Sequence, residues 1–315
     1  MIQEQISLHG AAAAFFPPQT GKLAVVTGAS GGLGYEIAKA LAQSCADVII
    51  ASRNDARGRS AAGAIRAVAP RALIRFEKLD LADLASIRAF AARLSATERP
   101  IDLLINNAGV MALPKRQLTT DGFEMQLGTN YLGHFALTAL LLPQLRLGRR
   151  PRVVQVSSRF HRYGTIRFDD LNGECIYKPW AAYCQSKLAL LLFAQQLQSR
   201  SDQAKWGLLS SAVHPGFART NLFANGRGKR SASSLVRNFL GTVMSQSAAD
   251  GAKSALFAAT SADVLPGGFY GPGGLFEFAG PPMIAHLSRR ARQKEVAAKL
   301  WKVSEELTGA HFPRD

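Results

Sequence analysis

Cysteine and histidine, the residues that build disulfides and most metal sites, are scarce in this sequence. The 315 residues include only three cysteines, Cys45, Cys175 and Cys184, and their spacing is not that of zinc ligands. An odd number of widely separated cysteines is typical of reduced thiols, so we expect a cytoplasmic protein. The six histidines form no HxxxH or comparable pair. We therefore expect no dedicated metal site.

Long hydrophobic runs are also lacking. The longest apolar run, residues 135–142, ends at Pro143 and is too short to cross a bilayer. The N-terminal segment 1–20 lacks the charged beginning of a signal peptide and is interrupted by Pro17 and Pro18. We therefore expect a short N-terminal arm and no membrane span.

Acidic residues are few compared with basic ones. The sequence has 22 Asp and Glu against 38 Lys and Arg, which gives a net charge of +16. Such an excess fits a nucleic acid, an anionic membrane surface or an anionic cofactor. The arginines are scattered, with denser runs at 146–152, 227–237 and 289–294, and no nucleic-acid-binding motif accompanies them. We favour a general arginine-rich composition and expect no specific nucleic-acid partner, although a salt-sensitive association with nucleic acid stays open.

The sequence does contain a regular alternation of short β-type runs and helical periodicity. The predicted strands are residues 23–27, 47–53, 72–79, 101–105, 152–156, 208–213 and 268–270. This alternation predicts a doubly wound parallel sheet of about seven strands with helices on both faces. No internal repeat or low-complexity linker divides the chain. We predict a single α/β Rossmann domain over 21–309, with a polar loop around 217–247 and a C-terminal tail over 310–315.

The first predicted strand leads into a glycine-rich turn, which a helical segment follows. In this order, glycines let the backbone approach a phosphate, and the helix N-terminus offers N–H donors. A glycine-rich turn alone is weak evidence for a ligand site, but its place between a strand and a helix predicts a dinucleotide site. The predicted contacts in the turn are Gly28, Ser30, Gly32, Leu33 and Gly34.

The end of the second predicted strand indicates which dinucleotide binds. An NAD-preferring site places an acidic residue there to bind the adenine ribose, but this sequence has Ser52 and Arg53. Arg53, followed by Arg57 and Arg59, suits a 2′-phosphate, because guanidinium binds phosphate bidentately. The alternative is a solvated basic loop, and we expect NADP(H) in preference to NAD(H). After the third strand, Asp80 is either an adenine contact or a turn residue.

Tyr183 and Lys187 lie four residues apart in a long segment of good helix-forming residues. Residues at this spacing project side by side from a helix. An ammonium next to a phenol favours the phenolate. We therefore expect Lys187 to lower the pKa of Tyr183 towards working pH, as a proton-transfer group requires. The alternative is a chance pair on an amphipathic helix.

Several motifs along the chain together resemble the short-chain dehydrogenase/reductase family. They are Thr27-Gly28-x-x-x-Gly32-x-Gly34, Asn106-Asn107-Ala108-Gly109, Ser158 and Tyr183-x-x-x-Lys187, in this order. The segments 130–135, 156–158, 183–187 and 214–216 resemble its retinol-dehydrogenase-like branch. The resemblance implies an oxidoreductase that interconverts a small lipophilic alcohol and its ketone or aldehyde with NADP(H).

The resemblance also implies a role for each catalytic residue. Tyr183 would exchange a proton with the substrate oxygen, Lys187 would favour the phenolate and hold the nicotinamide ribose, and Ser158 would hydrogen-bond the substrate oxygen. Asn130 would hold a water that links Lys187 to solvent, although a polar residue in an apolar helix is often a satisfied core amide. The further cofactor contacts are Arg53, Asp80, Leu81, Asn107, Ala108, Gly109, Pro215, Gly216 and Thr220.

By the same resemblance, the loop after Thr220, with Leu222 and Phe223, would cover the substrate as a lid. Two other functions stay open. One is a reductase of a conjugated double bond, and the other is a non-catalytic NADP(H)-binding regulator, which an incomplete Asn–Ser–Tyr–Lys set would have favoured. Family members often form homodimers or homotetramers, and the sequence does not decide between these states.

Overall fold

A computed structural model describes residues 16–216 and 247–313 of the chain. Its strands are β1 (Leu23–Thr27), β2 (Asp47–Ser52), β3 (Ile74–Lys78), β4 (Leu103–Asn106), β5 (Arg152–Val156), β6 (Leu209–Val213), β7 (Phe269–Pro272) and β8 (Pro282–Ile284). They form one sheet in the order β3-β2-β1-β4-β5-β6-β7-β8. The seven predicted strands are parallel, and β8 adds an antiparallel strand that was not predicted.

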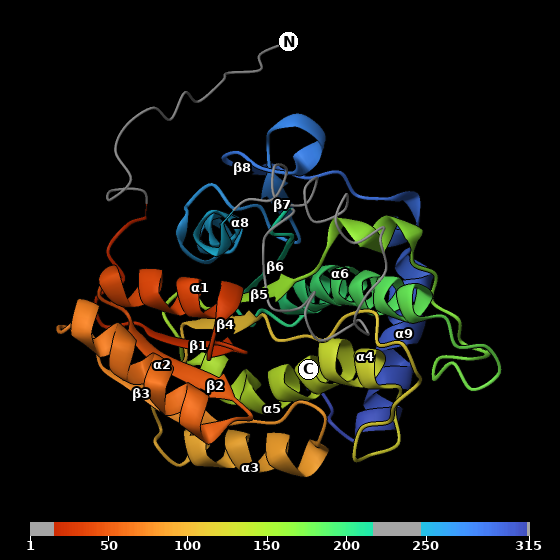
Figure 1. Cartoon of the computed structure of the whole chain (residues 1–315), viewed down its shortest axis with the longest axis horizontal. Coiled ribbons are helices and arrows are strands. Elements are labelled where there is room, and N and C mark those ends of the chain that lie inside the picture. Colours follow the sequence, from red (N-terminus) through yellow and green to blue (C-terminus); the bar gives the residue numbers. More distant parts are fainter. Residues whose placement is uncertain (1–15, 217–246, 314–315) are drawn as a thin grey trace, which may run out of the picture.

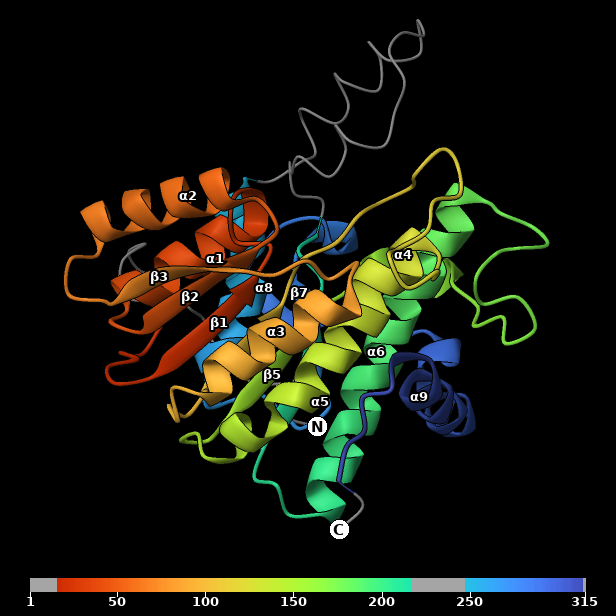
Figure 2. The same ribbon diagram turned by 90° about the horizontal axis from the view of Figure 1, so that it is seen from below.

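Helices cover both faces of this sheet (Figure 1). One face carries α1 (Gly32–Gln43), α2 (Asp55–Val68) and α8 (Ala248–Thr260). The other carries α3 (Leu84–Ser95), α5 (Gly133–Arg146) and α6 (Pro179–Gln203). Figure 2 shows α9 (Lys294–Thr308) alongside α6. The shorter turns are α4 (Met125–Leu127), η1 (Gly128–Leu132), η2 (Arg159–Tyr163), η4 (Leu275–Glu277) and η5 (Arg289–Arg292). The predicted doubly wound arrangement is therefore confirmed.

The central strands of the sheet, such as β1 and β4, are continuous apolar runs because both of their faces are buried. In β1, Leu23 and Val25 pack with the core on the α3 side, whereas Ala24 and Val26 pack with the core on the α1 side. This is the alternation that a pleated strand imposes on successive side chains. Burying a Leu or Val side chain stabilises the fold by about 1.5–3 kcal/mol, so a one-residue slip of β1 would be costly.

The C-terminal end of the chain belongs to the core on the α6 side. Trp301 of α9 is fully buried, and its ring centroid lies 5.1 Å from Phe135, 5.7 Å from Phe193 and 4.4 Å from Phe312. Ala310 is buried as well. The packed unit therefore includes Phe312, which the sequence analysis assigns to a tail.

The strand order places the candidate site. From β1 the strand order extends to β2 and β3 on one side and, after the chain crosses back, to β4 and the later strands on the other. In such sheets the crevice at the carboxyl ends of the strands, next to this reversal, binds ligands. The first fifteen residues of the predicted arm and residues 217–246 of the predicted lid lie outside the described residues.

Candidate active site

A cleft of about 890 Å³ lies at the carboxyl ends of the parallel strands. It is lined by fourteen of the predicted site residues: Gly28, Ser30, Gly32, Leu33, Gly34, Arg53, Asp80, Leu81, Asn107, Ala108, Gly109, Tyr183, Lys187 and Pro215. The lining also includes Ser60, Val110, Thr129 and Val156, which sequence reasoning missed. Val110, Thr129 and Val156 are next to Gly109, Asn130 and Ser157 in the sequence, and Ser60 lies about one helical turn after Arg57. This proximity is the only sequence signal that could have found them.

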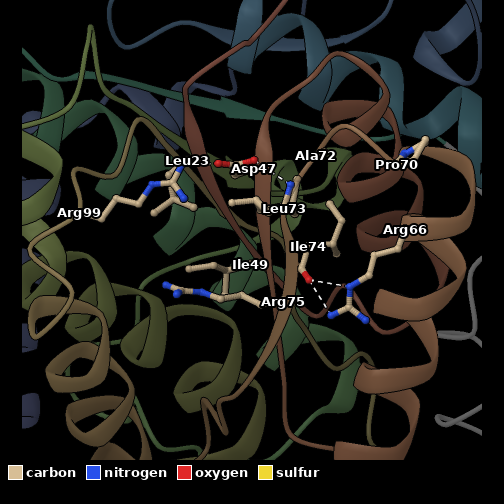
Figure 3. A pocket seen from close by; sticks show the side chains of 11 residues that line it. Leu23, Asp47, Ile49, Arg66, Pro70, Ala72, Leu73, Ile74, Arg75 and Arg99 are labelled. Atoms are coloured by element: carbon tan, nitrogen blue, oxygen red, sulfur yellow. Dashed lines mark hydrogen bonds and ion pairs between the residues drawn. The ribbon is translucent and has the colours of Figure 1, made fainter.

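A second cavity, of about 580 Å³, lies at the opposite ends of β1 and β2 (Figure 3). Three of its charged side chains, those of Asp47, Arg66 and Arg99, have partners within the chain. Arg66 donates hydrogen bonds to the backbone oxygen of Ile74, and Arg99 forms an ion pair with Asp47. None of the predicted site residues lines this cavity. The cleft at the carboxyl ends is therefore the candidate active site.

The glycine turn after β1 permits close approach of backbone to ligand. Gly28 has a left-handed φ of 67°, and a Cβ there would meet the Cα of Ala108 at 2.9 Å. A Cβ at Gly34 would lie 2.5 Å from the Asn107 amide nitrogen. Helix α1 begins after Gly31, which makes no side-chain cap hydrogen bond. The N-terminus of α1 therefore faces the cleft without a capping side chain, as a site for a phosphate requires.

Thr27 joins this turn to the segment after β4. Its hydroxyl oxygen accepts hydrogen bonds from the backbone N–H groups of Asn107 (2.9 Å) and Ala108 (3.0 Å). The His134 ring lies between Thr27 and Asn130, with Nε2 2.9 Å from the Thr27 hydroxyl oxygen and Nδ1 2.8 Å from the Asn130 carbonyl oxygen. Burial lowers the pKa of His134 to about 3, so the ring is neutral. The network therefore couples the cofactor turn to Asn130.

The predicted basic group after β2 is only partly assembled in the cleft. Arg53 and Arg57 line it, and both are exposed. Arg59 is directed elsewhere, because it pairs with Asp55 at 3.7 Å and its guanidinium lies 5.5 Å from the Phe76 ring centroid. Two of the three predicted arginines are thus available to a 2′-phosphate.

Asp80 is predicted to be either an adenine contact or a turn residue, and its surroundings bear on both roles. Its Oδ1 accepts a hydrogen bond from the backbone N–H of Ala82 at 3.0 Å, as a turn residue does. The residue nevertheless lines the cleft.

Tyr183 and Lys187 lie on α6, at the same end of the cleft. The Lys187 ammonium lies 5.8 Å from the Tyr183 ring centroid and donates a hydrogen bond to the backbone oxygen of Val156 at 2.8 Å. The Tyr183 hydroxyl is hydrogen-bonded to that of Ser158. The end of β5 and the start of α6 therefore place three of the four predicted catalytic side chains together.

The pKa values of this pair differ from the expected ones. Burial raises the pKa of Tyr183 to about 12, although the hydrogen bond from Ser158 lowers it in part. Burial also lowers the pKa of Lys187 to about 7. The expectation that Lys187 depresses the pKa of Tyr183 is wrong for the protein alone, because desolvation of both groups outweighs their attraction. Tyr183 is a protonated acid at neutral pH, and Lys187 changes charge in that range.

Asn130 lies in η1, a π-helical turn, and is fully buried. Its carboxamide oxygen accepts from the Val110 backbone N–H at 2.7 Å, and its nitrogen donates to the Val110 oxygen and the Ser186 hydroxyl, each at 2.9 Å. The carboxamide therefore braces the segment after β4 against α6. A Cβ at Gly109 would lie 3.0 Å from this oxygen and 3.6 Å from the Lys187 ammonium. The role of Asn130 in holding a water stays a prediction.

The remaining predicted residues follow β6. Gly216 does not line the cleft, but it follows Pro215 directly, with a left-handed φ of 65°, and its N–H donates to His214 Nδ1 at 3.2 Å. Thr220, Leu222 and Phe223 lie outside the described residues.

Within residues 16–216 and 247–313, no three or more His, Cys, Asp or Glu side chains gather as a metal site would need. Within the same ranges, no helix combines the length and apolar character needed to cross a membrane.

Comparisons with known proteins agree with this geometry. Residues 22–231 match the short chain dehydrogenase family. The chain is 41% identical over 304 residues to polyprenol dehydrogenase of Mus musculus, covering 93% of this chain and 86% of the relative. It is 42% identical over 292 residues to retinol dehydrogenase 12 of Homo sapiens, covering 93% and 88%.

A crystal structure of an uncharacterized protein from Mycobacterium paratuberculosis superposes with a TM-score of 0.80 at 41% identity, covering 97% of this chain and 100% of that one. The resemblance to the retinol-dehydrogenase-like branch is confirmed by these relatives. The chain belongs to the short-chain dehydrogenase family, whose members are oxidoreductases that bind a nicotinamide dinucleotide.

Proposed function

We propose that this protein is an NADP(H)-dependent oxidoreductase that interconverts a lipophilic alcohol and its ketone or aldehyde, with Tyr183 as the general acid and base. One observation carries the proposal. Tyr183 is hydrogen-bonded to Ser158 and lies beside the buried Lys187 at one end of the cleft. The glycine turn and Arg53 line the same cleft. A proton-transfer group and a dinucleotide cradle thus share one cavity.

The side chains have separate tasks in this reaction. The nicotinamide, when bound, supplies or accepts the hydride. Ser158 and Tyr183 present two hydroxyls to one substrate oxygen, where negative charge develops during reduction. Tyr183 enters as a neutral phenol and donates its proton to that oxygen. The pKa of Lys187 is about 7, and the protonated Lys187 ammonium stabilises the resulting phenolate.

Aromatic side chains beside Tyr183 support a lipophilic substrate. The ring centroid of Phe160 lies 6.5 Å from that of Tyr183, and the centroid of Trp180 lies 6.0 Å from it. Phe160 and Trp180 also contact each other, at 5.3 Å, and Trp180 is 38% exposed. An apolar surface of this kind next to the reacting hydroxyl favours hydrocarbon over polar groups on the carbonyl.

Trp180→Ala tests this part of the proposal. Loss of the indole is expected to raise KM for long-chain or ring-bearing aldehydes roughly 5- to 20-fold, because about 1–2 kcal/mol of apolar contact is removed. KM for a two- or three-carbon aldehyde should change less than about 3-fold. Steady-state kinetics on both substrate classes would show the difference. An equal rise for short and long aldehydes would contradict an aromatic wall for the substrate.

The residues at the end of β2 support NADP(H). Ser52 and Arg53 occupy the position where an acidic residue would favour NAD(H), and Arg57 lines the same part of the cleft. A carboxylate at this point would repel a 2′-phosphate, whereas two guanidinium groups attract it.

Arg53→Asp tests the cofactor preference. Reversal of the charge is expected to raise KM for NADPH roughly 10- to 100-fold, which corresponds to about 1.4–2.8 kcal/mol, and to leave KM for NADH within about 3-fold. Arg59→Asp is the matched control, because Arg59 lies over the Phe76 ring and does not line the cleft. If both variants lose NADPH affinity equally, general charge and not a 2′-phosphate site explains the preference.

The proposed reaction itself is tested by oxidation of NADPH over a panel of lipophilic aldehydes and ketones, with NADH alongside. Product identification separates carbonyl reduction from reduction of a conjugated double bond. Cofactor binding without turnover of any carbonyl, alcohol or conjugated alkene would overturn the proposal and favour a regulator.

A further inference from the structure

Two consecutive residues after β7 adopt an uncommon backbone conformation. Phe276 and Glu277 have φ values of 52° and 57°, in the left-handed region that side chains with a Cβ rarely occupy. Each such residue costs about 1–2 kcal/mol. Conformations of this kind persist where surrounding contacts fix them, and they gather at functional sites. The contacts of Glu277 show what fixes this one.

The Glu277 carboxylate contacts three partners from separate segments. Its Oε2 lies 3.2 Å from Nε2 of His214 and 3.5 Å from an Arg162 guanidinium nitrogen. Its Oε1 accepts a hydrogen bond from the backbone N–H of His286 at 3.0 Å. The contacts with His214 come first among the causes that lower the pKa of Glu277 to about 2. The group is therefore a carboxylate at neutral pH.

Two of these partners, Arg162 and His214, belong to the loops that follow β5 and β6 at the candidate site. Arg162 lies in η2, which starts directly after Ser158, and His214 directly precedes Pro215 of the cleft. A third contact adds to them, because the Arg159 guanidinium lies 4.5 Å from the ring centroid of Phe278. The segment 277–278 thus connects the loop after β5 with the loop after β6.

The Nε2 atom of the His214 ring faces the Glu277 carboxylate. Its Nδ1 accepts the N–H of Gly216, so in the neutral ring the proton is on Nε2, which faces Glu277. The ring is fully buried, and a Cβ at Gly271 would lie 2.0 Å from Nε2. Removing the carboxylate therefore takes away the negative charge that lies 3.2 Å from this buried nitrogen, and leaving a buried polar group uncompensated typically costs about 1–3 kcal/mol.

We propose that Glu277 is a positioning residue for the carbonyl-binding end of the site, which fixes the loop after Ser158 and the turn before Pro215 relative to each other. The proposal rests on the proposed function, because it assigns the substrate side of that same site. Glu277 itself does not line the cleft, so its effect on catalysis passes through Arg162 and His214.

Glu277→Gln tests the proposal, because glutamine keeps the volume but offers one acceptor oxygen and no charge. Glu77→Gln is the matched control. Glu77 pairs with Arg93 at 3.2 Å and is 25% exposed, against 23% for Glu277, and it lies on β3 at the other end of the sheet. Hydrogen–deuterium exchange of peptides covering 158–164 and 209–216 is the first readout. Kinetics with a lipophilic aldehyde and titration with NADPH are the second.

The expected result has three parts. Exchange in both peptides accelerates in Glu277→Gln and not in Glu77→Gln. KM for the aldehyde rises roughly 10-fold, because the substrate oxygen is less well positioned, and Kd for NADPH stays within about 2-fold. In a double-mutant cycle, Arg162→Gln and Glu277→Gln are less than additive, as residues in contact are.

Two outcomes would overturn the proposal. Exchange that matches the control in both peptides would show that Glu277 does not brace these loops. If exchange accelerates in Glu277→Gln but KM for the aldehyde equals that of the control variant, Glu277 is a purely structural residue that does not position the substrate. If the wild-type protein reduces no carbonyl, the proposed function fails, and the exchange experiment still decides by itself whether Glu277 braces the loops.

Discussion

Tyr183→Phe is expected to lower kcat for carbonyl reduction by roughly 10²- to 10⁴-fold, the range over which a positioned general acid contributes to a rate. The Tyr183 hydroxyl is hydrogen-bonded to Ser158 at the end of the cleft, whereas the neighbouring Lys187 ammonium donates to the backbone oxygen of Val156. Phenylalanine keeps the ring contacts with Phe160 and Trp180. Kd for NADPH, measured by fluorescence titration, should therefore change less than about 3-fold.

Tyr131→Phe is the control for this variant. Tyr131 is a buried tyrosine of the core that does not line the cleft, and its hydroxyl is hydrogen-bonded to that of Ser304 at 2.7 Å. Its loss should cost about 1 kcal/mol of stability and no activity at a temperature where the fold is intact. Activity of Tyr183→Phe within 3-fold of wild type would show that another group donates the proton.

Much of the fold was predictable because strands buried on both faces have few sequence alternatives. The run Leu23–Thr27 and its six parallel counterparts are short, most of them are largely apolar, and each forms a strand, although the edge strand β3 (IRFEK) is mostly polar. Strand β8 was missed for a physical reason. Pro282–Ile284 is three residues long, follows Pro281, and pairs with β7 at the sheet edge. Only tertiary pairing makes this segment a strand, and no local pattern encodes it.

The candidate site was predictable where residue types follow strand ends. Gly28, Asn107 and Pro215 follow β1, β4 and β6, so a parallel sheet brings them to one edge whatever the loops do. Arg59 was not predictable in this way, because the rotation of α2 about its axis decides whether its side chain reaches the cleft or the Phe76 ring. Contacts of Glu277 with His214 and Arg162 join residues far apart in the sequence, and no spacing indicates them.

The pKa values of the catalytic pair show what spacing alone leaves out. Tyr183 and Lys187 are neighbours on α6, as four-residue spacing requires. Their protonation, however, depends on how much water reaches them. Lys187 is 4% exposed and has a carbonyl oxygen as its partner, not a carboxylate. Burial without a counter-charge destabilises the ammonium. Lys187 therefore lowers the stability of the folded protein at the site where the proposed reaction uses its charge.

Lys187→Met is therefore expected to lower activity and to raise stability. Loss of the ammonium should reduce kcat/KM by about 100-fold or more, because the phenolate of Tyr183 is no longer stabilised. The free energy of unfolding at pH 6 should rise by a few kcal/mol, since the unfolded lysine keeps a pKa near 10.5 while the folded one has a pKa of about 7. Chemical denaturation and steady-state kinetics on the same preparation measure both effects. Lys302→Met, on the exposed side of α9, is the control.

The pH dependence of this gain distinguishes buried charge from improved packing. Below pH 7 both states of the wild-type protein are protonated at Lys187, and folding bears the full cost of burying the ammonium. Between pH 7 and pH 10.5 the folded state releases its proton while the unfolded state retains it, so wild-type stability rises with pH. The advantage of Lys187→Met should thus be about 2–3 kcal/mol smaller at pH 9 than at pH 6. A gain that is the same at both pH values would mean that folding does not shift the pKa of Lys187 and that the methionine only packs better.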